Sequence, residues 1–140
     1  MLKKTVTYTD FNGTERTEDF YFNLTKAEIW EMDMSVKDKE HLERSYSDYV
    51  RGIMDRMNGK EIMAFFKDLI LRAYGEKSED GKRFIKSEEL STNFSYTEAY
   101  SELFIELCTN ADAASEFVRG IMPVQISDEE LKAAQREMQN

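Results

Sequence analysis

The chain has 140 residues, of which 41% are hydrophobic, and 19 basic against 28 acidic residues give it a net charge of −9. This length and apolar content suit one domain with a packed core and argue against global disorder. An acidic surface repels nucleic acid backbones and anionic membranes, so we expect no nucleic acid and no membrane among the partners. The single cysteine, Cys108, cannot form an internal disulfide, which fits a reducing, cytoplasmic setting.

Residues 3–24 predict a β-hairpin. Apolar and polar residues alternate over 3–9 and again over 14–24, which is the periodicity of a strand. Asn12-Gly13 lies between the two stretches and is a hairpin turn signal. Because a lone hairpin is marginal in water, we expect this one to pack on helices.

The following residues, 26–123, predict helices. Three capping boxes, each with a serine or threonine three positions before a glutamate, indicate helix starts: Thr25/Glu28, Ser95/Glu98 and Ser127/Glu130. Apolar stripes at helical spacing lie within 42–57, 62–73, 96–107 and 114–121. Gly75 is placed to cap a helix C-terminus, and Asn110 to cap a helix N-terminus. The fold class is therefore α+β, an N-terminal β-hairpin packed on a bundle of about five or six helices.

We expect one globular domain over 1–123, made of the hairpin 3–24 and the helices 26–123, which end at Pro123. Residues 124–140 predict a semi-detached C-terminal helix, because its apolar face has few members. Those members are Leu131, Ala134 and Met138, and they are the candidate partner-binding residues.

The stretch GEKSEDGKRFIKSEE, residues 75–89, has some features of a calcium loop. With Gly81 at the sixth position of an EF-hand loop, Arg83 takes the eighth position and Ser87 the twelfth, where the loop needs an apolar residue and a glutamate. A shift by one residue places Lys77 at the first ligand position. We therefore expect no calcium site and predict a charged, hairpin-like connector between two helical regions. A polar recognition edge or an oligomer contact is the alternative role.

No catalytic or metal-binding pattern is apparent. His41 is the only histidine and lies in a charged run, which favours an exposed structural role over a catalytic base. Cys108 ends an apolar stripe, and no basic residue stands near it in sequence to lower its pKa, which favours a core position. The glutamate pairs at 88–89 and 129–130 open or precede helices, where they complement the helix dipole. We expect no enzyme, no cofactor and no metal.

Aromatic and methionine residues at helical spacing have two interpretations. The residues concerned are Tyr46, Tyr49, Tyr96, Tyr100, Met54, Met57, Met63 and Met122. Core packing is favoured, and an adaptable groove that accepts a partner helix is the alternative.

Three segments that together cover most of residues 5–123 resemble the tail assembly chaperones of siphophages and prophages of Gram-positive hosts: VTYTDFNGTERTEDFYFNLTKAEIWEMDMS, EIMAFFKDLILRAYGEKSEDGKRFIKSEE and FSYTEAYSELFIELCTNADAASEFVRGIMP. The resemblance implies a protein made in the host bacterial cytoplasm during tail morphogenesis. It implies that the protein binds the long, helical, hydrophobic tape measure protein, keeps that client soluble and helps to recruit tail tube protein. It also implies absence from the mature virion, but it transfers no binding residue.

Two rival functions remain open at this point. One is a structural phage tail or head–tail connector component, and the other is a small enzyme that uses acidic residues, for which no convergent set of residues is apparent. A homo-oligomer is a further expectation.

Overall fold

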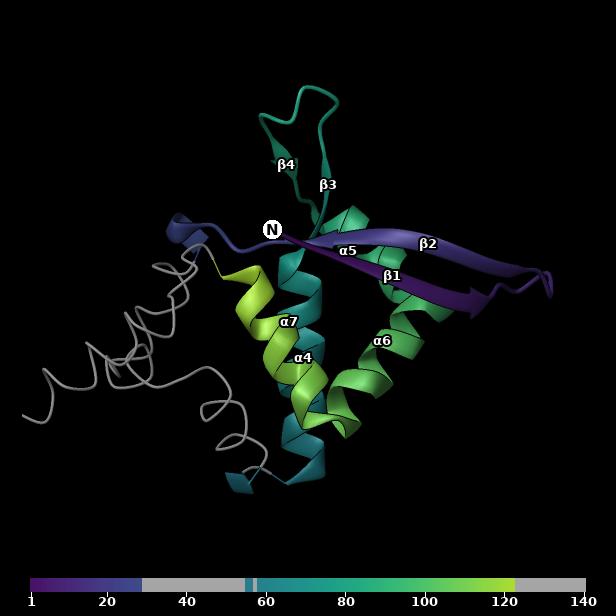
Figure 1. Ribbon diagram of the computed structural model, residues 1–140, viewed down its shortest axis with the longest axis vertical. Helices are drawn as coiled ribbons and strands as arrows, with labels where there is room; N and C mark the ends of the chain where they lie inside the picture. Colours follow the sequence, from purple (N-terminus) through teal and green to yellow (C-terminus); the bar gives the residue numbers. More distant parts are fainter. Residues whose placement is uncertain (29–54, 57, 123–140) are drawn as a thin grey trace, which may run out of the picture.

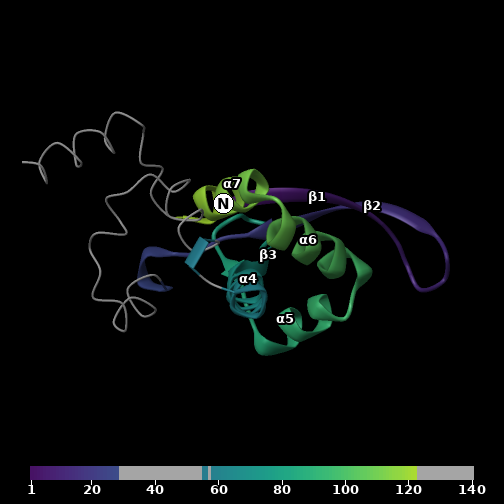
Figure 2. The same cartoon turned by 90° about the horizontal axis from the view of Figure 1, so that it is seen from below.

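The computed structural model describes residues 1–28, 55–56 and 58–122. Its elements are β1 (Leu2–Thr9), β2 (Glu15–Phe22), α4 (Gly59–Ala73), β3 (Tyr74–Lys77), β4 (Phe84–Ile85), α5 (Glu88–Ser95), α6 (Glu98–Thr109) and α7 (Ala111–Ile121). The β1–β2 pair lies across one end of α4, α6 and α7, and its turn projects beyond α6 (Figures 1 and 2). The prediction of an α+β fold, a hairpin packed on helices, is confirmed.

The N-terminal hairpin forms where alternation predicted it. β1 and β2 pair antiparallel without a break in register, from Leu2 opposite Phe22 to Thr9 opposite Glu15. The turn between them contains Gly13, whose φ of +80° lies in the left-handed region that favours glycine. The Asn-Gly turn signal is therefore confirmed.

The connector is also a hairpin, and it extends the N-terminal sheet. The described strands form a four-stranded sheet in the order β1-β2-β3-β4. Tyr21 and Phe22 of β2 pair antiparallel with β3, and β3 then pairs antiparallel with β4. The predicted hairpin-like connector is confirmed, whereas its pairing with β2 was not predicted.

One acidic residue of the connector, Asp80, stabilises the turn of the β3–β4 hairpin. The Asp80 carboxylate accepts hydrogen bonds from the Ser78 hydroxyl (2.7 Å) and the Lys82 N–H (3.0 Å). Gly81 follows with φ of +74°. Asp80 therefore acts as a turn-stabilising side chain.

The core lies between the sheet and the helices and is centred on aromatic rings. Phe22 is fully buried and makes edge-on contacts with Tyr74, Phe94 and Phe117, at centroid distances of 5.3 to 5.8 Å. Tyr74 and Phe94 stack at 4.2 Å. These contacts join β2, β3, α5 and α7 in one hydrophobic cluster.

Side-chain caps start the described helices. Asn58, Ser87, Thr97 and Asn110 cap α4, α5, α6 and α7, each accepting a backbone N–H of the first turn. The cap predicted at Asn110 is confirmed.

The capping box of Thr25 and Glu28 is confirmed by reciprocal hydrogen bonds of 2.9 and 3.1 Å, and residues 26–28 are helical. The box predicted for Ser95 and Glu98 is wrong, because α5 continues to Ser95 and Thr97 caps α6 instead.

The predicted cap at Gly75 is also wrong. α4 ends at Ala73, and Gly75 is a buried residue of β3 with no positive φ. A Cβ atom there would lie 2.7 Å from the Phe84 ring and 2.8 Å from the Ile85 carbonyl oxygen. Close approach of two strands, rather than a helix end, therefore explains the glycine.

Several predictions fall outside the described residues. They are His41, Tyr46, Tyr49, Met54, Met57, Pro123, the box Ser127/Glu130, the arm 124–140 and its residues Leu131, Ala134 and Met138.

Candidate functional site

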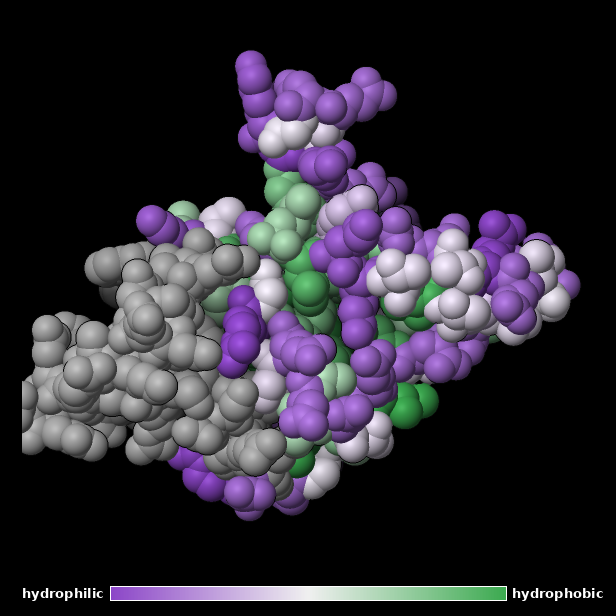
Figure 3. Space-filling view, in the orientation of Figure 1, coloured by the Kyte–Doolittle hydropathy of each residue, from purple (hydrophilic) through white to green (hydrophobic). Residues whose placement is uncertain are grey.

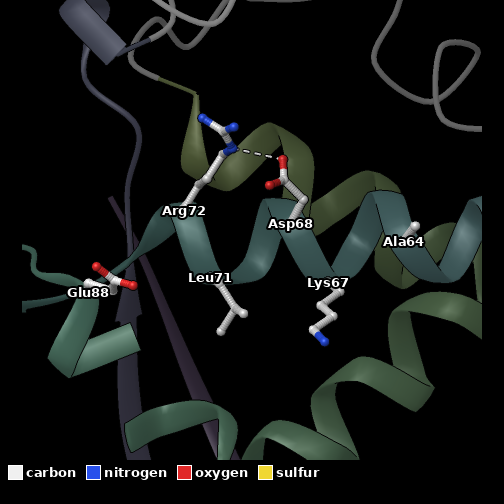
Figure 4. A pocket seen from close by; sticks show the side chains of 6 residues that line it. All are labelled: Ala64, Lys67, Asp68, Leu71, Arg72 and Glu88. Carbon is white, nitrogen blue, oxygen red and sulfur yellow. Dashed lines mark hydrogen bonds and ion pairs between the residues drawn. The ribbon is translucent and has the colours of Figure 1, made fainter. Parts of the chain in front are cut away.

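An open groove of about 910 Å³ lies along α4 beside the start of α5 (Figure 4). Ala64, Lys67, Asp68, Leu71 and Arg72 of α4 and Glu88 of α5 line it.

The sequence of α4 places all of these residues except Leu71 away from the core, and Leu71 packs against it. Phe66, Leu69, Ile70 and Ala73 are its buried face. The lining residues of α4 fall between them at helical spacing, and all but Leu71 are exposed. Leu71 is half-buried, and its carbonyl oxygen accepts a hydrogen bond from the hydroxyl of Ser91 in α5 (2.9 Å). That bond joins the two helices that border the groove.

The groove is lined by two apolar residues and by charges of both signs. Leu71 and Lys67 point to one side of α4, whereas Asp68 and Arg72 lie on the other (Figure 4). The Arg72 Nε atom is 2.8 Å from the Asp68 carboxylate, an exposed pair one helical turn apart. Glu88 lies in the first turn of α5, where its charge complements the helix dipole. Such a surface suits an amphipathic helix, which presents apolar and charged residues together.

Other residues singled out in the sequence lie elsewhere. Cys108 is half-buried against the core, and burial raises the pKa of its thiol, which keeps it in the less nucleophilic protonated form. Tyr100 and Met122 pack against the core as predicted. Core packing was the wrong interpretation for Met63 and Tyr96, which are 45% and 70% exposed.

The groove itself was not predicted. The signal available in the sequence was the exposed side of the 62–73 stripe, where Ala64 and Leu71 are seven residues apart and so share a face of the helix. The contribution of Glu88 depends on how α5 packs against α4, which local pattern does not determine.

The β3–β4 hairpin is a second surface feature. It projects from the body of the protein and its outer part is hydrophilic (Figures 1 and 3). The Lys86 ammonium at its base donates to the Asn23 carbonyl oxygen and to the Glu28 carboxylate, both at 2.6 Å. These bonds tie the hairpin to the segment that follows β2.

The part of the chain that the structure describes has neither a metal-binding cluster nor a helix that could span a membrane. Among the described residues, no group of three or more histidine, cysteine or acidic side chains is arranged to hold a metal ion. No helix in the same part of the chain has the length and apolar character needed to cross a bilayer.

The described residues form a small α+β domain with an open groove lined by charges of both signs. The chain matches the profile of the family described as phage tail assembly chaperone over residues 1–140, and it belongs to that family. No curated protein and no solved structure matches it significantly. The resemblance noted in the sequence is confirmed at the level of the family, and the match carries no information on the host.

Proposed function

We propose that this tail assembly chaperone binds the tape measure protein during tail morphogenesis and catalyses no reaction. Membership of the family over residues 1–140 carries the proposal. In this proposal the protein works in the cytoplasm of the host bacterium, keeps its helical client soluble, helps to recruit tail tube protein and is absent from the mature virion.

The groove along α4 is the proposed client site. A helical, hydrophobic client exposes apolar stripes before it is enclosed in the tail tube, and a helix laid in a groove buries such a stripe. Leu71 and Ala64 offer apolar contact, and the charges of Lys67 and Glu88 can pair with either sign on the client. The net charge of −9 keeps the loaded chaperone soluble.

Residues 124–140 are the proposed second contact. Leu131, Ala134 and Met138 share one face of the helix that the sequence predicts there. A narrow apolar face of this kind suits docking onto a partner better than packing in a core.

Co-expression with the tape measure protein tests the groove. Leu71→Glu should move the client from the soluble to the insoluble fraction, because it buries a charge under the client helix. Ile62→Glu is the matched control, since Ile62, like Leu71, is a half-buried residue of α4 that packs against the core, and it does not line the groove. The proposal fails if the two variants act alike, or if the wild-type protein does not keep the client soluble.

The rival function is a structural phage tail or head–tail connector component. A structural component remains in purified particles and need not raise the solubility of the tape measure protein. The two functions therefore differ in both measurements.

A further inference from the structure

The hydrogen-bond pattern of the sheet determines which backbone groups of β1 face outward. The Asp10 N–H donates to the Thr14 carbonyl oxygen (2.8 Å), so this pair continues the hydrogen-bonded set of the β1–β2 ladder. Hydrogen-bonded and non-hydrogen-bonded pairs alternate along antiparallel strands, so the even-numbered residues of β1 bond to β2. The Asn23 N–H donates to the Ala73 carbonyl oxygen (2.8 Å), so the odd-numbered residues of β2 direct their backbone N–H and C=O groups toward β3. The even-numbered residues of β2 are therefore the ones that bond to β1, in agreement with the pattern of β1.

The odd-numbered residues of β1 therefore direct their N–H and C=O groups away from β2. These residues are Lys3, Thr5, Thr7 and Thr9, and all four are exposed. Within the part of the chain that the structure describes, no group bonds to these N–H and C=O groups. β1 is also the first strand in the sheet order, so among the described residues no strand pairs with its outer edge.

This edge lacks most of the features that prevent pairing with another strand. Protective features in natural sheets include proline, bulges, very short strands and charged side chains. β1 is eight residues long, has no proline and pairs with β2 without a bulge. Its charges, Lys3 and Lys4, are confined to one end, and threonine, which favours strands, dominates the rest.

We propose that the outer edge of β1 pairs antiparallel with β1 of a second copy of the chain. Lys3 then lies opposite Thr9 of the second copy and Thr5 opposite its Thr7, and each of these pairs exchanges two N–H···O bonds. The two helical bodies share one face of the joined sheet. The pairing concerns self-association and does not depend on the proposed client groove.

Charge complementarity identifies the second copy as the occupant. Within each copy, Thr9 of β1 pairs with Glu15 of β2. In the joined sheet, Lys3 of one copy therefore lies beside Thr9 of the second copy, and Glu15 of the second copy lies next in the same row across the strands. Lys3 has no ion pair among the described residues. A parallel pairing would instead bring the lysine ends of the two copies together, and like charges on adjacent strands are destabilising.

The ends of the two strands complement each other as well. The same register brings Met1 of one copy to the hairpin turn that contains Phe11 of the other. Both residues are exposed, at 56% and 79%, so the pairing shields two apolar side chains at each end.

A proline substitution tests the edge. Thr7→Pro removes an N–H that bonds to no group among the described residues of the monomer, and proline is tolerated at such edge positions. Thr7→Ala removes the same hydroxyl contact to Thr17 but keeps the N–H, so it is the matched control. Sedimentation velocity should give a dimer for the wild type and for Thr7→Ala, and a monomer with an unchanged circular dichroism spectrum for Thr7→Pro.

Charge exchange tests the register without altering the backbone. Lys3→Glu and Glu15→Lys should each weaken the dimer, and mixing the two variants should restore it as a heterodimer. Within one copy the two positions are six residues apart along the hairpin, about 20 Å, so the rescue reports on contact between copies.

A monomeric wild type overturns the proposal, as does a dimer that Thr7→Pro leaves intact. It is also overturned if mixing the charge variants restores nothing. An edge that binds only an extended segment of a client would give a monomeric wild type and is thus a contradicting outcome.

Discussion

Two residues of β4 leave no room for a side chain at Gly75. The Phe84 ring and the Ile85 carbonyl oxygen occupy the space where a Cβ atom would stand. Sequence pattern favoured a helix cap because a glycine after an apolar stripe commonly ends a helix. The contact that explains the glycine joins β3 to β4, which are separated by the turn 78–83. A local sequence pattern therefore does not reveal this contact.

Gly75→Ala should therefore lower the free energy of unfolding by about 1–3 kcal/mol, the range for overpacked sites. Gly59→Ala is the control, since a Cβ atom at Gly59 meets no atom within 4 Å, and we expect it to be neutral or slightly stabilising. Urea denaturation of both variants measures the difference. Equal effects would show that β3 and β4 separate easily.

Glu28 links the end of the N-terminal hairpin to the connector. Burial raises the pKa of its carboxyl, but hydrogen bonds from the Lys86 ammonium and the Thr25 N–H outweigh burial, and the pKa lies below its ordinary value of 4.5. A pKa lowered by folding stabilises the folded state above the unfolded-state pKa, and the stabilisation disappears as pH falls through the folded-state pKa.

The melting temperature should consequently fall more steeply in the wild type than in Glu28→Gln when pH is lowered from about 7 to about 3. Glu102→Gln, at an exposed position of α6, makes the same change in net charge and should keep the steep fall. Parallel curves for the wild type and Glu28→Gln would mean that the Lys86 contact has no part in acid stability.

Elements built from local signals could be predicted from the sequence, and those built from distant contacts could not. The hairpin 3–24 follows from alternation and an Asn-Gly turn, and α7 follows from Asn110 and its apolar stripe. α5 is short and has only two large apolar residues, Leu90 and Phe94, so its periodicity is weak. The β2–β3 pairing rests on two residue pairs far apart in sequence. The α4 groove was missed for the same reason, since it depends on the position of α5.

The start of α6 shows how packing selects between two local signals. Ser95 and Thr97 are both suitable caps, but α5 extends through the buried Phe94 and so includes Ser95. The Thr97 hydroxyl accepts from the Tyr100 N–H (3.1 Å), whereas the Ser95 hydroxyl donates to the Thr92 carbonyl oxygen (2.6 Å).

Thr97→Ala should therefore destabilise the protein by about 1 kcal/mol, the typical effect of losing a helix N-cap. Ser95→Ala should have a smaller effect, because it leaves the first turn of α6 capped. Chemical denaturation of both variants compares their losses in the free energy of unfolding. A larger loss for Ser95→Ala would show that Thr97 is not the residue that caps α6.

At the scale of the whole molecule, stability should reside in the core of residues 1–122. Leu103 is fully buried in α6, so Leu103→Ala should lower the free energy of unfolding by about 2–5 kcal/mol. Deletion of 124–140 should leave the melting temperature nearly unchanged and weaken client binding, as expected of a semi-detached arm. A deletion as damaging as Leu103→Ala would place the arm in the core.

Quantitative mass spectrometry of a phage lysate and of particles purified from it tests the central claim most directly. In the proposed function, the chain acts on the tape measure protein and leaves before the tail is complete. The chain should thus be abundant in the lysate and absent from the particles, while the tape measure and tail tube proteins are present in both. Recovery of the chain in the particles at a fixed ratio to the tape measure protein would contradict the account and identify a structural component.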